Sequence, residues 1–373
     1  MIYTVATKPL CDGLNLAIVN SNVSKFSQKS NVAQLSVKDG LLYVNIETDN
    51  VFSEASFKGG AEGDGSPIVL VDCLKLKQLV GTFDAPVTKI EFVDGGVVLY
   101  SGKSKFTLAK IIDVEDMELT RPNTEGAVIS TSDLDVESWK FVDDHQMFAI
   151  AMSFINPVFT RVWAGQNGDI IVGDMDNGIF THSMKNTLDE TCLLRSEVIN
   201  TFASVPSGAK ITKRDKSYIV SIETDGYTFC SEIRPDYEDN PKFGSYNADI
   251  ILNMMVKTDD KAVKVNTPRI LKSLSQSELL RSESIDTHVV KVTLENGQMS
   301  FVDSSINCVV DVEGDTSAAY TINMKSKTLR SAISNLDEEV VMVAPAVNDE
   351  SQEIVGLLMW TKNIVILVAG AED

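Results

Sequence analysis

The sequence has few of the residues that secreted, metal-binding and membrane-spanning proteins depend on. Its five cysteines are odd in number, and no two of them are close enough to form a CxxC pair. This argues against a disulfide framework or a zinc site and fits buried thiols in a reducing compartment. The three histidines, His145, His182 and His288, lie far apart without metal-ligand spacing.

Long apolar runs are also missing. The most apolar stretch, 354–371, is interrupted by Thr361-Lys362-Asn363, so neither half reaches the ~20 residues that a spanning helix needs. We predict a hairpin of two buried strands there and no membrane association. The first residues show no basic segment followed by an apolar one. We therefore expect no signal peptide and a cytoplasmic location.

Basic residues are scarce. The chain carries 33 Lys and Arg against 53 Asp and Glu, a formal net charge of −20. A uniformly acidic surface repels DNA, so a nucleic-acid role requires the basic side chains to be segregated onto one face. With 373 residues, of which 43% are hydrophobic, the chain can form substantial cores, and its length predicts two or three domains.

Enzyme motifs are incomplete. Gly102-Lys103-Ser104 imitates the end of a P-loop, but Val97 stands where the first glycine is required, and a strand rather than a helix is expected to follow. The segment 174–178 resembles the start of a calcium loop, but Lys185 occupies the place of the bidentate glutamate. No nucleophile turn of the GxSxG type accompanies the histidines. We therefore predict that the chain is not an enzyme and uses no metal or other cofactor.

Most of the chain has the pattern of short strands. Runs rich in β-branched and aromatic residues alternate with turn signals such as Asp94-Gly95-Gly96 and Glu295-Asn296-Gly297. The expected strands lie at 41–46, 88–92, 97–100, 170–173, 218–222, 288–294 and 340–344. Apolar spacings of three and four residues predict short amphipathic helices at 72–83, 134–151, 193–205, 267–280 and 326–336, and a further one at 10–19.

The order of these elements repeats along the chain. Segment 68–111 is expected to form a strand, a helix, a strand, a turn and a strand, and segments 191–233 and 319–369 follow the same order. Three unrelated β-rich domains are the alternative, but they leave the matched order unexplained. We predict an α+β protein of three similar domains, each with two short helices over antiparallel sheets, with boundaries at 1–125, 126–250 and 251–373.

Short motifs in the first two units are similar to those of one family. The first unit contains Ser101-Gly102-Lys103-Ser104-Lys105-Phe106, and the second contains Thr228-Phe229-Cys230-Ser231 followed by Pro235-Asp236-Tyr237. They resemble the Ser-Gly-Arg-Ser-Arg-Phe, Phe-Thr-Ser and Phe-Pro-Asp-Tyr segments of the bacterial-type DNA polymerase β sliding clamps. The resemblance covers the full length in order and size, but it is close only in these patches.

The resemblance implies a fold and a function. Two chains would close head to tail into a homodimeric ring of clamp-type domains, with helices lining the hole, sheets outside and edge strands paired between subunits. Such a ring encircles double-stranded DNA and tethers a replicative DNA polymerase for processive synthesis. The rival class is a non-enzymatic structural or adhesive β-repeat protein, which does not require a basic helix face in each unit.

The resemblance also implies a hydrophobic pocket that binds peptides of the polymerase and the clamp loader, between the second and third domains. The family's Thr-Asp-Gly-His-Arg-Leu and Met-Pro-Met-Arg-Leu segments are replaced here by 174–179 and 367–373. A divergent, phage-encoded clamp with its own partner preference would explain this departure. The candidate pocket residues are Asp174, Asn177, Ile179, Val365 and Leu367, and plain core packing is the alternative for each apolar one.

Basic side chains occur on most of the expected helices in spite of the net charge. The candidates for sequence-independent phosphate contacts are Lys75, Lys77, Arg195, Arg269, Lys272, Lys327 and Arg330. For any single one of them, an ordinary solvated helix face is the alternative. The helix expected at 134–151 runs against the pattern, because Asp135, Glu137, Asp143 and Asp144 make it acidic.

Overall fold

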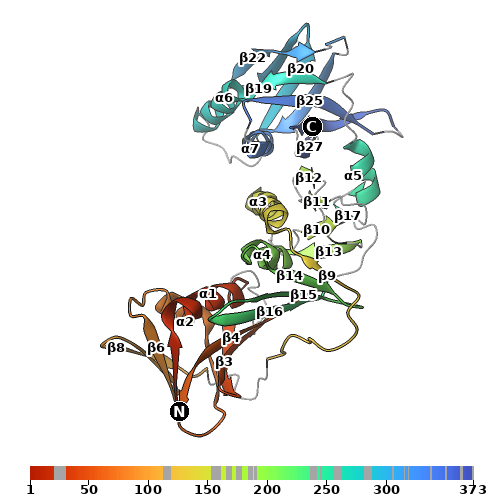
Figure 1. The fold of residues 1–373 in the computed structure, drawn as a ribbon. Helices are drawn as coiled ribbons and strands as arrows, with labels where there is room; N and C mark the ends of the chain where they lie inside the picture. Colours follow the sequence, from red (N-terminus) through yellow and green to blue (C-terminus); the bar gives the residue numbers. More distant parts are fainter. Residues whose placement is uncertain are drawn as a thin grey trace. The chain divides into compact units, whose positions relative to one another are not determined.

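The protein is described here from a computed structural model, which forms two compact units, Met1–Lys140 with Arg195–Asp236 and Phe141–Leu194 with Tyr237–Asp373 (Figure 1). Each unit is described by itself. The structure describes residues 1–20, 31–111, 119–152, 161–164, 170–173, 179–183, 188, 191–235, 242–243, 246–255, 262–280, 288–304, 306–314, 316–317, 319–336, 338–348, 351–361 and 364–371. The predicted domain boundaries at 125 and 250 stay a prediction.

The first unit is built on one 12-stranded antiparallel sheet with the order β8-β7-β6-β1-β4-β16-β15-β14-β9, from which β2, β3 and β5 branch. Its elements are β1 (Ile2–Ala6), α1 (Thr7–Ala17), β2 (Val32–Lys38), β3 (Leu41–Glu47), β4 (Val51–Glu62), β5 (Ile68–Asp72), α2 (Cys73–Val80), β6 (Val87–Val93), β7 (Gly96–Ser101), β8 (Ser104–Ala109), β9 (Ser130–Asp133), α4 (Ser196–Ser204), β14 (Lys210–Lys213), β15 (Tyr218–Glu223) and β16 (Tyr227–Ile233). The helix α3 (Val136–Met152) begins in this unit and continues into the other.

The long strand β4 holds this sheet together. Its first residues pair with β16, from Val51 opposite Ile233 to Phe57 opposite Tyr227, and its last residues pair with β1. The helix α1 covers the strands at this junction, and Gly13 allows the close approach: a Cβ atom there would lie 2.5 Å from Cε1 of Phe57. Residues far apart in the sequence therefore share one sheet and one covering helix.

The second unit contains a nine-stranded sheet with the order β13-β10-β11-β12-β27-β26-β25-β19-β23, a four-stranded sheet with the order β22-β21-β20-β24, and the ribbon β17–β18. Its elements are β10 (Arg161–Ala164), β11 (Ile170–Gly173), β12 (Ile179–Ser183), β13 (Cys192–Arg195), β17 (Lys242–Phe243), β18 (Tyr246–Asn247), α5 (Ala248–Met254), β19 (Val263–Asn266), α6 (Thr267–Leu280), β20 (Val289–Glu295), β21 (Gln298–Val302), β22 (Asn307–Asp311), β23 (Glu313–Gly314), β24 (Tyr320–Lys325), α7 (Ser326–Leu336), β25 (Val340–Val347), β26 (Ile354–Trp360) and β27 (Val365–Ala369).

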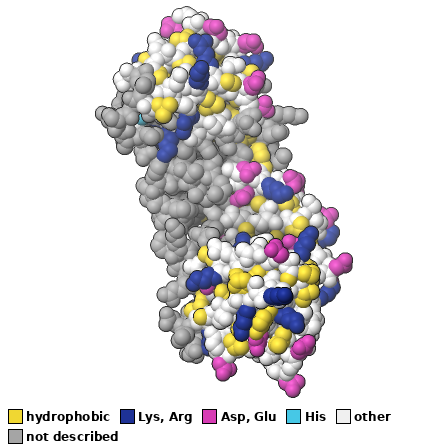
Figure 2. Space-filling view, turned by 90° about the vertical axis from the view of Figure 1, so that its left-hand side faces the viewer, with side chains coloured by type: hydrophobic (Ala, Val, Ile, Leu, Met, Phe, Trp, Pro, Cys, Tyr) yellow, Lys and Arg dark blue, Asp and Glu magenta, His cyan; other side chains and the backbone are white. Residues whose placement is uncertain are grey.

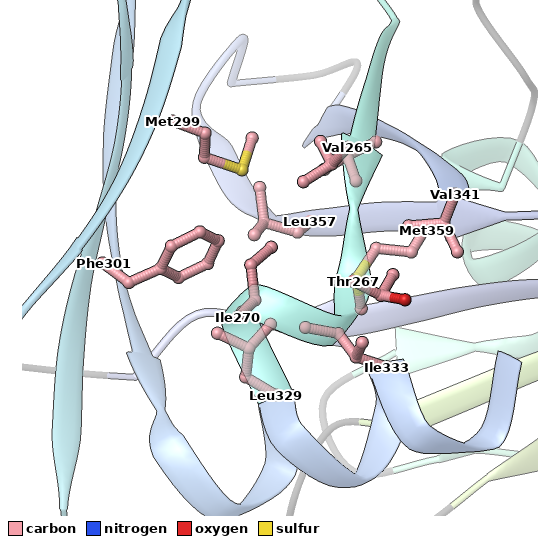
Figure 3. A pocket seen from close by; sticks show the side chains of 11 residues that line it. Val265, Thr267, Ile270, Met299, Phe301, Leu329, Ile333, Val341, Leu357 and Met359 are labelled. Carbon is pink, nitrogen blue, oxygen red and sulfur yellow. The ribbon is translucent and has the colours of Figure 1, made fainter. Parts of the chain in front are cut away.

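The helices α6 and α7 share one core with both sheets. Ile270 and Leu274 of α6 and Leu329 of α7 are buried with Val292 and Phe301 of the four-stranded sheet. Between them the core leaves an apolar cavity of about 10 Å³ (Figure 3), which has room for little more than one water molecule. It is lined by Val265, Thr267, Ile270, Met299, Phe301, Leu329, Ile333, Val341, Val343, Leu357 and Met359. The cavity is a packing gap and not a ligand site.

The predicted elements are largely confirmed. All six predicted helices occur, with ends shifted by a few residues, and the apolar stretch 354–371 forms the hairpin β26–β27, with Gly356 opposite Ala369 and Trp360 opposite Val365. The P-loop imitation is the tight turn between β7 and β8, where Gly102 has φ +59°, and a strand follows it as expected. The seven-residue helix α5 was not predicted, because it is too short to display an apolar period.

In the part of the chain that the structure describes, no helix combines the length and the apolar character that crossing a membrane requires. The same residues include no group of three or more His, Cys, Asp and Glu side chains placed to hold a metal ion.

Candidate functional site

The helices α1 and α2 pack against each other and present lysines to solvent. Asp72 caps α2 by accepting a hydrogen bond from the backbone N–H of Lys75 at 2.9 Å, and Nζ of Lys75 lies 3.5 Å from the same carboxylate. Lys77 is half-buried on α2 and forms no ion pair with any described residue. Sequence reasoning missed Lys8, which is exposed on α1. The signal was present, because the buried positions Thr7, Leu10, Leu14 and Ala17 leave Lys8 on the outer face.

The helix α6 places its cations opposite its buried residues. Arg269, Lys272 and Gln276 are exposed at spacings of three and four, whereas Ile270 and Leu274 face the core. Neither Arg269 nor Lys272 is ion-paired with a described residue. The two cations of α6 are therefore on its exposed face, opposite the face that packs in the core.

The helix α7 has the same division of faces. Lys327 and Arg330 are half-buried and lie on the side away from the core, whereas Leu329 and Ile333 are 1% and 3% exposed inside it. Lys327 and Arg330 also form polar or charged interactions with other groups. Of the seven predicted DNA-contacting residues, four therefore lie on α6 and α7, which pack side by side in one core.

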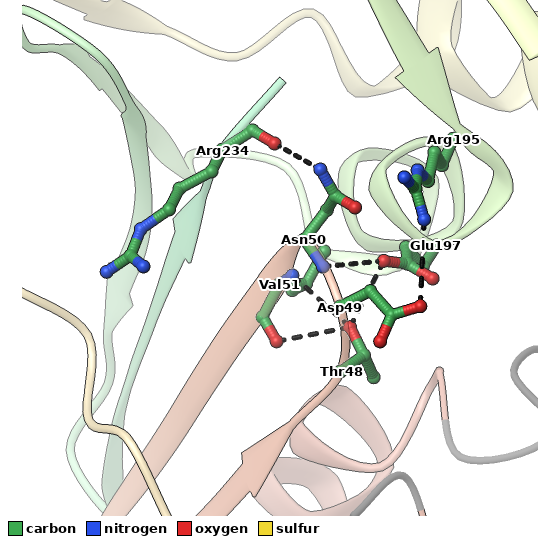
Figure 4. Close-up of polar contacts among 7 residues, drawn as sticks. All are labelled: Thr48, Asp49, Asn50, Val51, Arg195, Glu197 and Arg234. Carbon is green, nitrogen blue, oxygen red and sulfur yellow. Dashed lines mark hydrogen bonds and ion pairs between the residues drawn. The ribbon is translucent and has the colours of Figure 1, made fainter. Parts of the chain in front are cut away.

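Arg195 is in a different environment from the other candidates. It precedes α4 as the N-cap residue and is half-buried. One of its guanidinium nitrogens lies 3.6 Å from Oδ2 of Asp49 (Figure 4). An ion pair within the chain neutralises much of the charge that Arg195 would offer to a phosphate.

A buried carboxylate lies beside this ion pair. Glu197 of α4 is 4% exposed and accepts hydrogen bonds from the backbone N–H of Asn50 at 2.8 Å and from Oγ1 of Thr48 at 3.3 Å (Figure 4). Burial raises the pKa of Glu197, and the Asn50 N–H partly offsets this. The carboxylate thereby ties the turn between β3 and β4 to the first turn of α4.

The exposed stripe of α3 is acidic, as its sequence predicts. Glu137, Lys140 and Asp144 are exposed at spacings of three and four, and Nζ of Lys140 lies 2.9 Å from Oε1 of Glu137. The single cation of α3 is thus paired within its own helix, and Asp144 adds a further negative charge. This stripe offers no net positive charge to a polyanion.

Two of the five candidate pocket residues occupy buried positions. Asp174 and Asn177 lie outside the described residues. Ile179 is described only through its backbone, which pairs β12 with β27 opposite Val368. Val365 and Leu367 are 4% and 2% exposed, and both belong to a buried cluster that includes Trp163 and Trp360. Both side chains thus occupy core positions in this structure, and their role as pocket walls stays a prediction.

Two strands that are terminal in their sheets carry side chains of opposite charge. β8 is the terminal strand of the 12-stranded sheet, and β22 is the terminal strand of the four-stranded sheet. Lys103 and Lys105 are exposed at β8, and Asp311 and Glu313 are exposed at or just after β22. Terminal strands of this kind are templates for pairing with another chain. In Figure 2, Lys and Arg side chains gather among hydrophobic ones on the side of the first unit where Figure 1 places β8 and β6.

An aromatic pair lies beside the β8 edge. Phe83, which follows α2, and Phe106 on β8 are both half-buried, and their rings stack with centroids 5.4 Å apart and an interplanar angle of 25°. Half-buried aromatic rings of this kind are enriched where proteins associate. The β8 edge therefore combines a terminal strand, which pairs only with β7 among the described strands, with two lysines and an apolar contact surface.

Solved structures with the same fold were found over the whole chain. The chain is similar to the DNA polymerase III beta subunit of Thermotoga maritima, with a TM-score of 0.73, 15% identity, and 100% and 99% of the two chains covered. It is similar to the DNA polymerase III subunit beta of Pseudomonas aeruginosa, with a TM-score of 0.70, 13% identity and full coverage of both chains. It is also similar to the Helicobacter pylori beta clamp bound to a DNA ligase peptide, with a TM-score of 0.65, 13% identity and full coverage of both chains.

These similarities establish the fold. The chain has the α+β fold of the bacterial beta clamps, with three domains of antiparallel sheets and helices, as the sequence resemblance implied. No protein-family model matches the sequence, and no curated protein matches it either. At 13–15% identity to these structures the chain is a divergent example of the fold.

Proposed function

We propose that the protein is a DNA sliding clamp: a homodimeric ring, without catalytic activity or cofactor, that encircles duplex DNA and tethers a replicative polymerase. The observation that carries the proposal is the full-length match of fold to bacterial DNA polymerase III beta subunits. The cationic outer faces of α6 and α7 support it, because a protein that slides needs phosphate contacts without base contacts. A cytoplasmic location follows from this role.

Ring closure is proposed to pair β8 of one copy with β22 of the other. Among the described strands, each of the two pairs on one side only, and a terminal strand of this kind can pair with another chain. Lys103 and Lys105 on one edge oppose the charge of Asp311 and Glu313 on the other, although the Glu313 carboxylate also lies 4.0 Å from Nζ of Lys264. A heterologous contact of this kind closes into a ring when its rotation permits. The half-buried stack of Phe83 and Phe106 supplies an apolar contact beside the paired edges.

Partner binding is proposed by analogy with a relative of the same fold. The Helicobacter pylori beta clamp binds a DNA ligase peptide. We propose that the polymerase and the clamp loader dock extended hydrophobic peptides here in the same manner. The pocket residues remain Asp174, Asn177, Ile179, Val365 and Leu367. Because Val365 and Leu367 are buried, binding at these two side chains requires the neighbouring residues to move aside.

Charge reversal at the two edges tests the ring. One variant carries K103E and K105E, so that both of its edges are acidic, and the other carries D311K and E313K, so that both are basic. Each variant alone is expected to elute as a monomer in size-exclusion chromatography, because like charges meet at both closures. An equal mixture is expected to restore the dimer, since every closure then joins opposite charges.

Electron microscopy of the wild-type protein and of the mixture provides the second measurement. Rings with an open centre wide enough for duplex DNA are expected in both samples. Compact or elongated particles without a hole, in crosslinked samples as well, would overturn the clamp proposal and favour the structural β-repeat alternative. If rings form but each variant alone remains dimeric, closure uses surfaces other than β8 and β22.

A further inference from the structure

The helices of the clamp fold differ in the sign of their charge. α1 and α2 together carry three cations against one acid, and α6 and α7 carry four cations against one acid. α3 and α4 carry one cation against four acids. The chain as a whole is strongly acidic. The net positive charge of the first and last helix pairs is therefore opposite in sign to the net charge of the chain.

Ion pairing sharpens this contrast. Lys8 and Lys77 in the first pair, and Arg269 and Lys272 on α6, form no ion pair with any described residue. Lys75 lies 3.5 Å from a carboxylate oxygen of Asp72, and Lys327 and Arg330 have polar or charged interactions, so the contrast rests on the first four cations. By contrast, Lys140 of α3 lies 2.9 Å from a carboxylate oxygen of Glu137. Arg195, at the start of α4, lies 3.6 Å from one of Asp49. Cations that are already paired contribute little to the attraction of a phosphate.

The outer surfaces of the middle helices confirm the difference. The exposed stripe of α3 contains Glu137, Lys140 and Asp144, a net negative set. On α4, Glu197 is buried among backbone and hydroxyl donors, and the positions that reach the surface are Asn200 and Ser204. Charges are felt over a Debye length of about 8 Å at physiological salt, so a phosphate near this surface meets neutral or negative groups.

This inference rests on the proposed function. We propose that only α1–α2 and α6–α7 attract the phosphates of the encircled DNA, and that α3–α4 exerts no attraction on them. If β8 of one copy pairs with β22 of the next, the two cationic helix pairs belong to the domains on either side of each closure. The phosphate contacts would then gather at the two closures of the ring, with an acidic stretch between them.

The test compares neutral substitutions on the three helix pairs. The variants are K8Q/K77Q and R269Q/K272Q, with E137Q/K140Q as the matched control that removes one ion pair from α3. Affinity for a fluorescein-labelled duplex is measured by anisotropy between about 50 and 200 mM salt, where each phosphate contact contributes about 0.9 to the slope of log K against log salt. K8Q/K77Q and R269Q/K272Q are each expected to weaken binding and to flatten the slope by up to about 1.8. E137Q/K140Q should leave both affinity and slope unchanged.

Each outcome supports or overturns a specific claim. If E137Q/K140Q flattens the slope as much as the other pairs do, or if K8Q/K77Q and R269Q/K272Q leave affinity and slope unchanged, the proposed uneven distribution of DNA contacts is wrong while the clamp proposal stands. If the wild-type protein forms no ring and does not bind the duplex even at low salt, the proposed function itself fails, and this inference fails with it. Circular dichroism of every variant checks the fold, which should be retained because all substituted side chains reach the surface.

Discussion

The carboxyl group of Glu197 is buried in the first unit. It is nearly inaccessible and is held by the Asn50 backbone and the Thr48 hydroxyl. Burial raises its pKa above the ordinary value of 4.5. The folded state therefore binds this proton more tightly than the unfolded state does. The contribution to stability is fully present below pH 4.5 and is lost as the pH rises through the folded-state pKa.

Replacing Glu197 by Gln tests this linkage. Glutamine keeps an oxygen that accepts from Asn50 but cannot ionise, so the stability of Glu197→Gln should gain on the wild type as the pH rises above 4.5. Urea unfolding at several pH values measures the difference. Glu137→Gln, at an exposed position, is the control and should follow the wild-type profile. Parallel curves for wild type and Glu197→Gln would show that the buried carboxyl is not linked to folding.

At the same scale, the sequence identified which side chains are charged or apolar, but not which of them are accessible to a partner. Arg195 was predicted to contact DNA from its place before a helix, but the turn between β3 and β4 brings Asp49 to it. Asp49 is 146 positions earlier in the chain, and nothing local in the sequence signals the contact. Val365 and Leu367 were correctly identified as apolar strand residues, yet both faces of β27 are buried.

At the scale of elements, caps, turn residues and apolar spacing in the sequence were sufficient to predict most helices and hairpins. The helix α2 begins after Asp72, whose carboxylate accepts the N–H of Lys75, and buries Cys73, Leu76 and Val80 at spacings of three and four. The strands of the β6–β7 hairpin follow from β-branched runs on either side of Asp94-Gly95-Gly96, where Gly96 has φ +142°. α5 lacked such signals because seven residues span only two turns.

The cap of α2 provides a prediction at this scale. Asp72→Ala removes the side-chain acceptor and should lower the free energy of unfolding by about 1 kcal/mol. Asp72→Asn keeps an acceptor oxygen and loses only the charge near Lys75, so its loss should be much smaller. Denaturant unfolding of the two variants separates the cap from the ion pair. Equal losses would mean that the surface ion pair, and not the cap, stabilises the start of this helix.

At the scale of the whole molecule, the proposed ring makes stability depend on concentration. Association of folded chains stabilises them by mass action, so the melting temperature of the wild type should rise with protein concentration. The K103E/K105E variant, which is expected to stay monomeric, should melt at one temperature at all concentrations. Differential scanning calorimetry over a wide concentration range measures both. A concentration-independent wild-type transition would contradict reversible ring assembly under those conditions.

The sequence by itself determined the class of fold and the order of its elements. Hydrophobic periodicity, caps and turn residues act within a few positions, so strands such as β3, helices such as α6 and the β26–β27 hairpin can be read locally. The amphipathic pattern of α6 also placed Arg269 and Lys272 on its outer face, because a helix with one buried stripe exposes the opposite one.

Only the tertiary structure decided which charged side chains form ion pairs and which strands are terminal in their sheets. Ion pairing depends on distances between residues far apart in the chain, as for Arg195 and Asp49, and burial on both faces of a strand depends on what packs there, as for Val365 and Leu367. Strand order, which makes β8 and β22 terminal, follows from non-local pairing. Each strand pattern is compatible with several neighbours, and the packing of the complete core selects among them.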